Sequence, residues 1–172
     1  MTVTLTEYPT QKDWVAVKKR ALKTMGVKIK TLPDERWKRE ILEARHSPIR
    51  RLHFSFEIEN VPSWVSVHIV RHHVGIQPYV QSQRNDRQTA FDRNKAPQSN
   101  PVDMTLDLNA EALMVLANKR LCMQASKETR ELVQTMCDLV VEKCPEFEGL
   151  LVPMCEYHGG KCHEMKPCGR CE

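Results

Sequence analysis

Residues 46–73 read HSPIRRLHFSFEIENVPSWVSVHIVRHH, and this stretch decides much of the expected fold. Its first half alternates apolar and polar side chains, and the apolar positions are Leu52, Phe54, Phe56 and Ile58. A period of two places the two kinds of side chain on opposite faces of a β-strand, so we expect a half-buried strand. Pro62 suits the first turn of a helix, and we expect that helix to run from Trp64 to His73.

The remaining segments predict a mixture of helices with one more strand. We expect a strand at 2–6, helices at 12–25 and 34–44, and a helical region from Asp107 that Pro145 closes. The apolar stripes of that region are Ala110, Leu113, Met114, Ala117 and Leu121, followed by Leu132, Met136, Val140 and by Val133, Cys137, Val141, Cys144. Residues 84–103 are polar and aperiodic, which predicts a long loop that orders on ligand binding.

Length and composition indicate one ordinary globular domain. The chain has 172 residues, of which 41% are hydrophobic and 28% charged. No run of about 18 apolar residues predicts a membrane span, and no basic start followed by an apolar stretch predicts a secretory signal. We therefore expect a cytoplasmic protein. The net charge of +4 fits the binding of anionic small molecules as well as nucleic acid.

Arginine and histidine side chains gather in two distant parts of the sequence. Residues 71–73 read Arg-His-His, residues 82–84 read Ser-Gln-Arg, and Arg120 and Arg130 lie about three helical turns apart. A guanidinium group matches phosphate oxygens, and the amide of Asn118 can read the edge of a ring. This set suits a nucleotide or dinucleotide pocket. Spacing alone leaves open the alternative of solvated surface arginines.

Two stretches resemble the flavin-dependent thymidylate synthases. That family carries a histidine, a small residue and a second histidine before a phenylalanine-rich strand, and then a helix ending in Arg-His-Arg-x-x-Ser. The matching positions are His46, Ser47, His53, Phe54, Phe56, Arg71 and His72, and residues 82–84 are similar to the Ser-x-Arg that follows. Residues 118–132, NKRLCMQASKETREL, resemble the family's Arg-Leu-Cys-x-x-Ala-x-x-Glu-Ile-Arg helix through Arg120, Leu121, Cys122, Ala125, Glu128 and Arg130.

The resemblance implies both a fold and a chemistry. The implied fold class is α+β, a single domain in which a small antiparallel sheet packs with several helices. The implied protein is a homotetramer that binds FAD and dUMP at subunit junctions. NADPH reduces the flavin, methylenetetrahydrofolate supplies the one-carbon unit, and no cysteine nucleophile is required. The protein would then be a methyltransferase of thymidylate biosynthesis, in which the cofactor carries the chemistry and the protein orients the reactants.

The resemblance also implies site residues, by position. The flavin contacts would be Arg71, His72, His73, Asn118 and Arg120. The contacts to dUMP would be His68, Ser82, Arg84 and Arg130, with Arg130 as the catalytic residue.

Several positions depart from the family pattern. His73 replaces the third signature residue, Ile76 replaces the signature serine, Asn85 stands where tyrosine is usual, and Glu111 brings a negative charge where a positive one is expected. These departures keep an alternative open: a nucleotide-binding relative without thymidylate synthase activity, or an enzyme acting on another pyrimidine nucleotide. A nucleic-acid-binding module is the weakest alternative, because aromatic residues are only 6% and do not alternate with the basic ones.

The C-terminal segment 153–172 differs from the family-like segment 1–152 in being rich in cysteine and histidine. Cys155, Cys162, Cys168 and Cys171 have spacings that suit tetrahedral zinc, with Cys168-x-x-Cys171 as one standard half-site. An iron–sulfur cluster and a frayed tail with free thiols are the alternatives. Cys122, Cys137 and Cys144 lie at apolar helix positions and are expected in the core.

Overall fold

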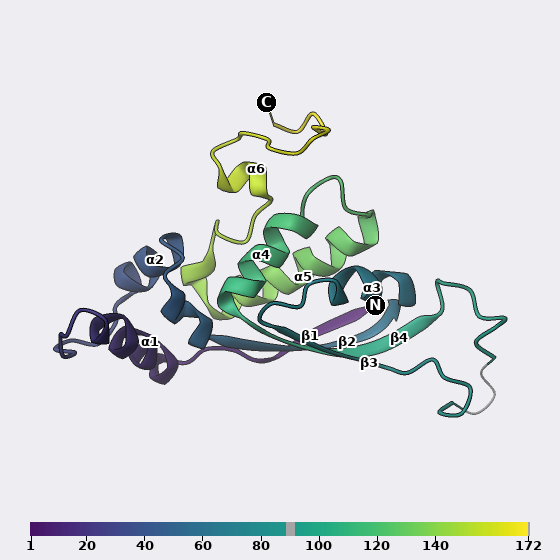
Figure 1. The fold of residues 1–172 in the computed structure, drawn as a ribbon, viewed down its shortest axis with the longest axis horizontal. Helices are drawn as coiled ribbons and strands as arrows, with labels where there is room; N and C mark the ends of the chain where they lie inside the picture. Colours follow the sequence, from purple (N-terminus) through teal and green to yellow (C-terminus); the bar gives the residue numbers. More distant parts are fainter. Residues whose placement is uncertain (89–91, 172) are drawn as a thin grey trace.

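The computed structural model describes residues 1–88 and 92–171, and the helices and strands follow the expected α+β class (Figure 1). The strands are β1 (Thr2–Glu7), β2 (His53–Pro62), β3 (Ile76–Val80) and β4 (Pro101–Asn109). The helices are α1 (Gln11–Lys23), α2 (Glu35–Glu43), α3 (Ser63–Val70), α4 (Ala110–Arg120), α5 (Lys127–Lys143) and α6 (Met154–Tyr157), with short 3₁₀ turns η1 (Ser47–Arg51) and η2 (Pro145–Phe147).

The four strands form one antiparallel sheet in the order β1-β2-β4-β3. Helices α3, α4 and α5 cover one face of this sheet, and α1 and α2 lie beyond its end (Figure 1). The alternation predicted for β2 is confirmed, because Phe54, Phe56 and Ile58 are buried while His53 and Glu57 are exposed. Burial of such large apolar side chains against the helices is the main stabilising contribution to the fold.

The prediction for residues 84–103 was wrong at its C-terminal end, and the helix expected from Asp107 begins later. β4 occupies Pro101–Asn109 and lies between β2 and β3, so a central strand was missed. The signal was present, because Val102, Met104, Leu106 and Leu108 alternate with polar residues and are all buried. Residues 89–91 of the predicted loop lie outside the described residues.

The turn after α3 positions the Arg-His-His segment. The helix ends at Val70 rather than at His73, so residues 71–73 lie in the turn that leads to β3. Gly75 has a φ of +73°, and a Cβ at this position would collide with the amide of Asn109. Asn109 donates its backbone N–H to the Gly75 carbonyl at 3.0 Å and caps α4 by accepting from Ala112 at 2.9 Å. The turn is therefore fixed against the start of α4.

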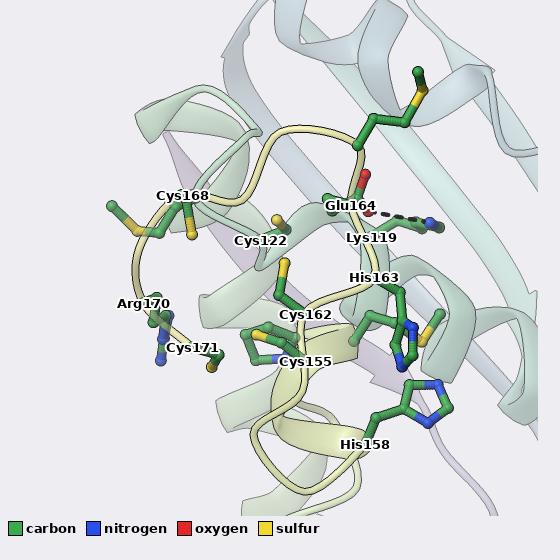
Figure 2. A pocket seen from close by; sticks show the side chains of 14 residues that line it. Lys119, Cys122, Cys155, His158, Cys162, His163, Glu164, Cys168, Arg170 and Cys171 are labelled. Atoms are coloured by element: carbon green, nitrogen blue, oxygen red, sulfur yellow. Dashed lines mark hydrogen bonds and ion pairs between the residues drawn. The ribbon is translucent and has the colours of Figure 1, made fainter.

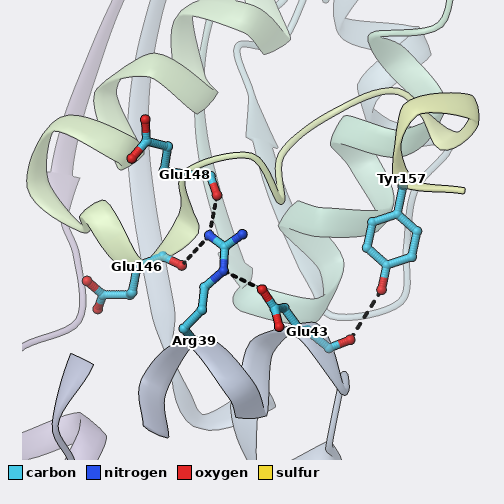
Figure 3. A network of polar contacts seen from close by, with 5 residues as sticks. All are labelled: Arg39, Glu43, Glu146, Glu148 and Tyr157. Carbon is cyan, nitrogen blue, oxygen red and sulfur yellow. Dashed lines mark hydrogen bonds and ion pairs between the residues drawn. The ribbon is translucent and has the colours of Figure 1, made fainter. Parts of the chain in front are cut away.

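A polar network joins α2 to the C-terminal segment (Figure 3). The Arg39 Nε donates to Glu43 at 2.6 Å, and its Nη1 donates to the carbonyls of Glu146 and Glu148. The Tyr157 hydroxyl donates to the Glu43 carbonyl at 3.3 Å. These contacts hold η2 and α6 against α2. In the part of the chain that the structure describes, every helix is too short or too polar to cross a membrane.

Candidate functional site

The two segments singled out by sequence meet where α4 ends beside the turn after α3. The Arg120 Nε donates to His72 Nε2 at 2.9 Å, and its Nη2 donates to the His68 carbonyl at 2.8 Å. An acceptor nitrogen carries no proton, so this contact assigns the His72 proton to Nδ1. Arg120 therefore holds a neutral imidazole whose second nitrogen is a hydrogen-bond donor.

Within the described residues, positive charge accumulates at this point without an ion pair to a carboxylate. Partial burial lowers the pKa of Arg120, and the neighbouring Arg71 guanidinium lowers it further. Burial, followed by the charge of Arg120, also lowers the pKa of His72, so its ring is neutral at pH 7. Among the described residues, neither Arg71 nor Arg120 forms a salt bridge. Two nearby unpaired guanidinium groups favour a bound anion.

His68 is held between α3 and α5. Its Nδ1 lies 3.0 Å from the hydroxyl of the fully buried Thr129, and its ring packs edge-on against Trp64 at 5.4 Å between centroids. Burial, with smaller contributions from Arg120 and Arg71, lowers the pKa of His68. One ring nitrogen is therefore used within the fold, and the other is the group that a ligand could contact.

The structure places Asn118, one of the expected flavin contacts, inside the protein. Its side chain is 0% exposed, its Oδ1 accepts from the Arg45 Nη2 at 2.5 Å, and its Nδ2 donates to the Val152 carbonyl at 2.7 Å. Arg45 in turn lies over the ring of Tyr157, 4.1 Å from its centroid. Both ends of the Asn118 amide are thus hydrogen-bonded inside the protein. Burial was not readable from the local motif.

Of the residues expected to bind dUMP, His68 contacts Arg120, whereas Ser82, Arg84 and Arg130 form no hydrogen bond or ion pair with it among the described residues. The Arg130 Nη1 donates to the carbonyls of Met123 and Ala125, which fixes the connection between α4 and α5. Ser82 and Arg84 are exposed after β3, where Arg84 pairs with Asp86 at 2.6 Å. Their neighbour Gln83 contacts Ser63 at the first turn of α3. His72 follows the last turn, so roughly 12 Å of helix separates the two groups.

Two small hollows flank the segment 71–73. One, of about 270 Å³, is lined by His72, Lys119, Arg120, Cys122, Gln124, Ala125 and Glu164. The other, of about 240 Å³, is lined by residues 71–74, Ile76, Glu111, Ala112 and Val115. The unexpected charge of Glu111 is explained by Arg50, whose Nε lies 2.5 Å from its carboxylate. Sequence reasoning missed Arg50, since the two residues are 61 positions apart.

The C-terminal cysteines surround a separate pocket of about 270 Å³ on the outer side of α4 (Figure 2). The labelled sulfur atoms of Cys122, Cys155, Cys162, Cys168 and Cys171 border this space, whereas His158 and His163 lie at its far side. The side-chain hydrogen bond with the Cys155 thiol is the main cause that raises the pKa of Cys171 to about 11. Among the described residues, no three His, Cys, Asp or Glu side chains already form a group that could hold a metal ion.

The other cysteines divide between core and surface. Cys137 and Cys144 are buried as expected, and burial raises the pKa of each to about 12. The expectation for Cys122 was wrong, because it follows the end of α4, is half-buried and borders the pocket of tail cysteines. The helix stripe on which that expectation rested stops at Leu121.

Comparison with known proteins agrees with this description. The sequence model of the family described as thymidylate synthase complementing protein matches residues 92–146, which include β4, α4 and α5. No curated protein matches the chain.

The solved structures that resemble this chain are distant in sequence and close in fold. Thymidylate synthase X from Helicobacter pylori with FAD and dUMP has a TM-score of 0.69 at 17% identity, covering 88% of this chain and 99% of that one. A second structure of the H. pylori enzyme, described as flavin dependent and complexed with FAD and dUMP, has a TM-score of 0.68 at 17% identity, covering 86% and 98%.

A UMP/dUMP methylase, PolB from Streptomyces cacaoi bound with 5-Br dUMP, has a TM-score of 0.63 at 13% identity, covering 84% and 92%. The matched segment and the shared fold together confirm the resemblance of this chain to the flavin-dependent thymidylate synthase family.

Proposed function

We propose that the protein is a flavin-dependent methyltransferase that transfers a one-carbon unit from methylenetetrahydrofolate to the ring of dUMP or a related pyrimidine nucleotide. FAD would be the bound cofactor and NADPH the reductant. The observation that carries the proposal is the unpaired positive cluster of Arg71 and Arg120 around the neutral ring of His72. It joins the two segments that resemble the family.

The residues of this cluster fit an anionic cofactor that also carries rings. Arg71 and Arg120 supply guanidinium donors for phosphate oxygens, while His72 and His73 supply further donors. Arg120 has already lost water on partial burial, which strengthens its attraction for an anion. FAD, when bound, would supply the hydride; the protein's own groups bind, orient and exclude water.

The size of the hollows supports a site shared between copies of the chain. Each hollow beside residues 71–73 has a volume of about 240–270 Å³, below the roughly 300–1,000 Å³ of a drug-sized ligand pocket. FAD exceeds that size, so one chain would hold only part of it. Ser82, Arg84 and Arg130 would then complete the site of another subunit in a homotetramer. A cross-linking and light-scattering measurement on the purified protein tests this assembly.

The flavin experiment compares the wild type with Arg120→Ala, Arg120→Lys and the exposed control Arg36→Ala. We expect the wild type and the control to retain a yellow flavin. Loss of a charge-assisted hydrogen bond weakens binding by about 1.5–3 kcal/mol, or about 10–100-fold for Arg120→Ala. Arg120→Lys should lie between, because lysine keeps the charge without the planar fork. Wild-type protein that takes up no FAD contradicts the proposal.

The reaction itself is tested with isotopically labelled methylenetetrahydrofolate, NADPH and either dUMP or UMP. Transfer of label to carbon 5 of one nucleotide is the expected result. Comparing the rates with the two nucleotides shows whether the enzyme distinguishes ribose, with its 2′-hydroxyl, from deoxyribose.

A second candidate is a binding protein of the same fold without turnover. It is favoured by Ile76, which stands at the signature serine position but is only 3% exposed and pairs with Leu108 in the sheet. That position therefore offers an apolar core side chain in place of a hydroxyl. Tight binding of FAD and dUMP with no methylated product in the same preparation would favour this candidate.

A further inference from the structure

The segment after α6 is held by few contacts of its own. Residues 158–171 contain no strand or helix, and most of their side chains are exposed. Backbone N–H groups of residues 158–160 donate to α6, and the side-chain contacts that tie the segment down include Lys119 with Glu164 at 3.4 Å, Gln124 with the Lys166 carbonyl at 2.5 Å, and Arg170 with Glu156. Exposed ion pairs stabilise a fold weakly, while ordering each residue has an entropic cost. The exposed ion pairs alone therefore attach the segment weakly.

Four thiols of this segment face one space. Cys155 is buried on α6, and Cys162, Cys168 and Cys171 border the same pocket from the segment that follows (Figure 2). The Cys171 thiol already contacts that of Cys155. Four cysteines with a C-x-x-C half-site are the ligand set of closed, tetrahedral zinc sites.

We propose that Cys155, Cys162, Cys168 and Cys171 bind one zinc ion, which fastens the segment after α6 back onto α6, beside the end of α4. Each thiol gives up its proton to solvent and binds the ion as a thiolate, with no change of oxidation state. The sulfurs border the pocket without forming a closed group, so the ion draws them together. Gly159, Gly160 and Gly169 have positive φ values and supply the turns that this movement uses.

The histidines of the segment are not assigned as ligands. His163 packs edge-on against His158 at 5.3 Å, and His158 packs edge-on against Tyr157 at 5.5 Å. This stack lies at the far side of the pocket from the sulfurs (Figure 2). Cys122 also borders the pocket but belongs to the α4–α5 connection, and it is left as a neighbouring free thiol.

The zinc site would stand next to the candidate flavin site. Glu164, which lies between Cys162 and Cys168, pairs with Lys119 and borders the hollow that contains His72 and Arg120. Fastening the segment therefore fixes one wall of that hollow. The zinc proposal does not rest on the flavin function, because metal content is measured without any nucleotide or flavin.

The test measures zinc by elemental analysis in untagged, full-length protein purified under reducing conditions. We expect about one zinc per chain. Cys162→Ser and Cys168→Ser should lower zinc affinity at least about 100-fold in competition with a chromogenic chelator. Cys122→Ser is the matched control and should keep its zinc. Protein that binds no added zinc, contains iron with sulfide instead, or loses zinc in the control but not in Cys168→Ser overturns the proposal.

A protease measurement on the wild type avoids variants that fail to fold. Lys161 and Arg170 are exposed trypsin sites within the segment that the four cysteines span. A strong chelator should make both bonds cleavable while residues 1–152 stay intact, and added zinc should restore protection. Cleavage at equal rates with and without chelator overturns the proposal. Flavin binding is recorded separately, so failure of the zinc site and failure of the proposed enzyme activity are distinguishable.

Discussion

Replacing Asn118 with alanine separates the role that its sequence position suggests from the role that its burial gives it. The variant removes two hydrogen bonds at a fully buried site: one accepted from Arg45 at 2.5 Å and one donated to the Val152 carbonyl at 2.7 Å. It also leaves the Arg45 guanidinium, whose Nε has no hydrogen-bond partner among the described residues, further unsatisfied.

The expected magnitude follows from these two contacts. A hydrogen bond to a charged group contributes about 1.5–3 kcal/mol and a neutral one about 0.5–1.5 kcal/mol. We therefore expect Asn118→Ala to lower the free energy of unfolding by about 2–4 kcal/mol. For a chain of this size, that corresponds to a fall in Tm of about 4–15 °C.

The assay is urea unfolding followed by circular dichroism, with flavin binding measured on the same samples. Asn118→Asp is an informative second variant, because it keeps an acceptor for Arg45 but loses the donor to Val152. We expect the free energy of unfolding of Asn118→Asp to lie between those of the wild type and Asn118→Ala. The exposed neighbour variant Lys119→Ala should change the free energy of unfolding by less than about 0.5 kcal/mol. The reasoning is refuted if Asn118→Ala unfolds like the wild type and binds flavin more weakly.

Three further predictions concern the surroundings of the site. Gly75→Ala should lower the free energy of unfolding by at least about 1–3 kcal/mol in thermal unfolding, because φ is +73° and a Cβ has no room; Gly26→Ala, with a φ of +68° but open space, should lower it less. The lowered pKa of His72 makes the unfolded state bind more protons below about pH 6.5. Stability should therefore fall as pH falls through that range, and less steeply in His72→Gln; equal slopes of Tm against pH contradict this. Glu111→Gln should release Arg50, which is 59% exposed, from its ion pair. Phosphate binding at low salt should then become tighter, while the free energy of unfolding changes by less than about 1 kcal/mol. Unchanged phosphate binding in calorimetry contradicts this.

Local patterns predicted most of the elements. The alternation in β2 and the stripes of α4 and α5 are confirmed, because each element buries a face whose period matches its own geometry. The missed strand β4 was readable in the same way from Val102 to Leu108. It was overlooked because the polar segment before it suggested that the loop continued.

The candidate site was predicted only in part. A hydrogen bond joins Arg120 to His72, and Arg71 lies near enough to lower the pKa of Arg120, while their expected role as flavin contacts stays a prediction. The hydrogen-bond partners of Asn118 and the ion-pair partner of Glu111 could not be predicted from the sequence. Each partner lies more than 30 positions away along the chain. Such contacts are set by the packing of helices rather than by local spacing.

The sequence by itself determined the α+β class, the resemblance to the flavin-dependent thymidylate synthases and the cysteine-rich character of the C-terminal segment. Periodicity and residue type are local properties, so they survive without coordinates. Only the tertiary structure decided that Asn118 faces inward, that Glu111 is balanced by Arg50, and that the four C-terminal thiols border one space with Cys122. The physical reason is that burial and charge balance are properties of neighbours in space, and the chain brings those neighbours together only when it folds.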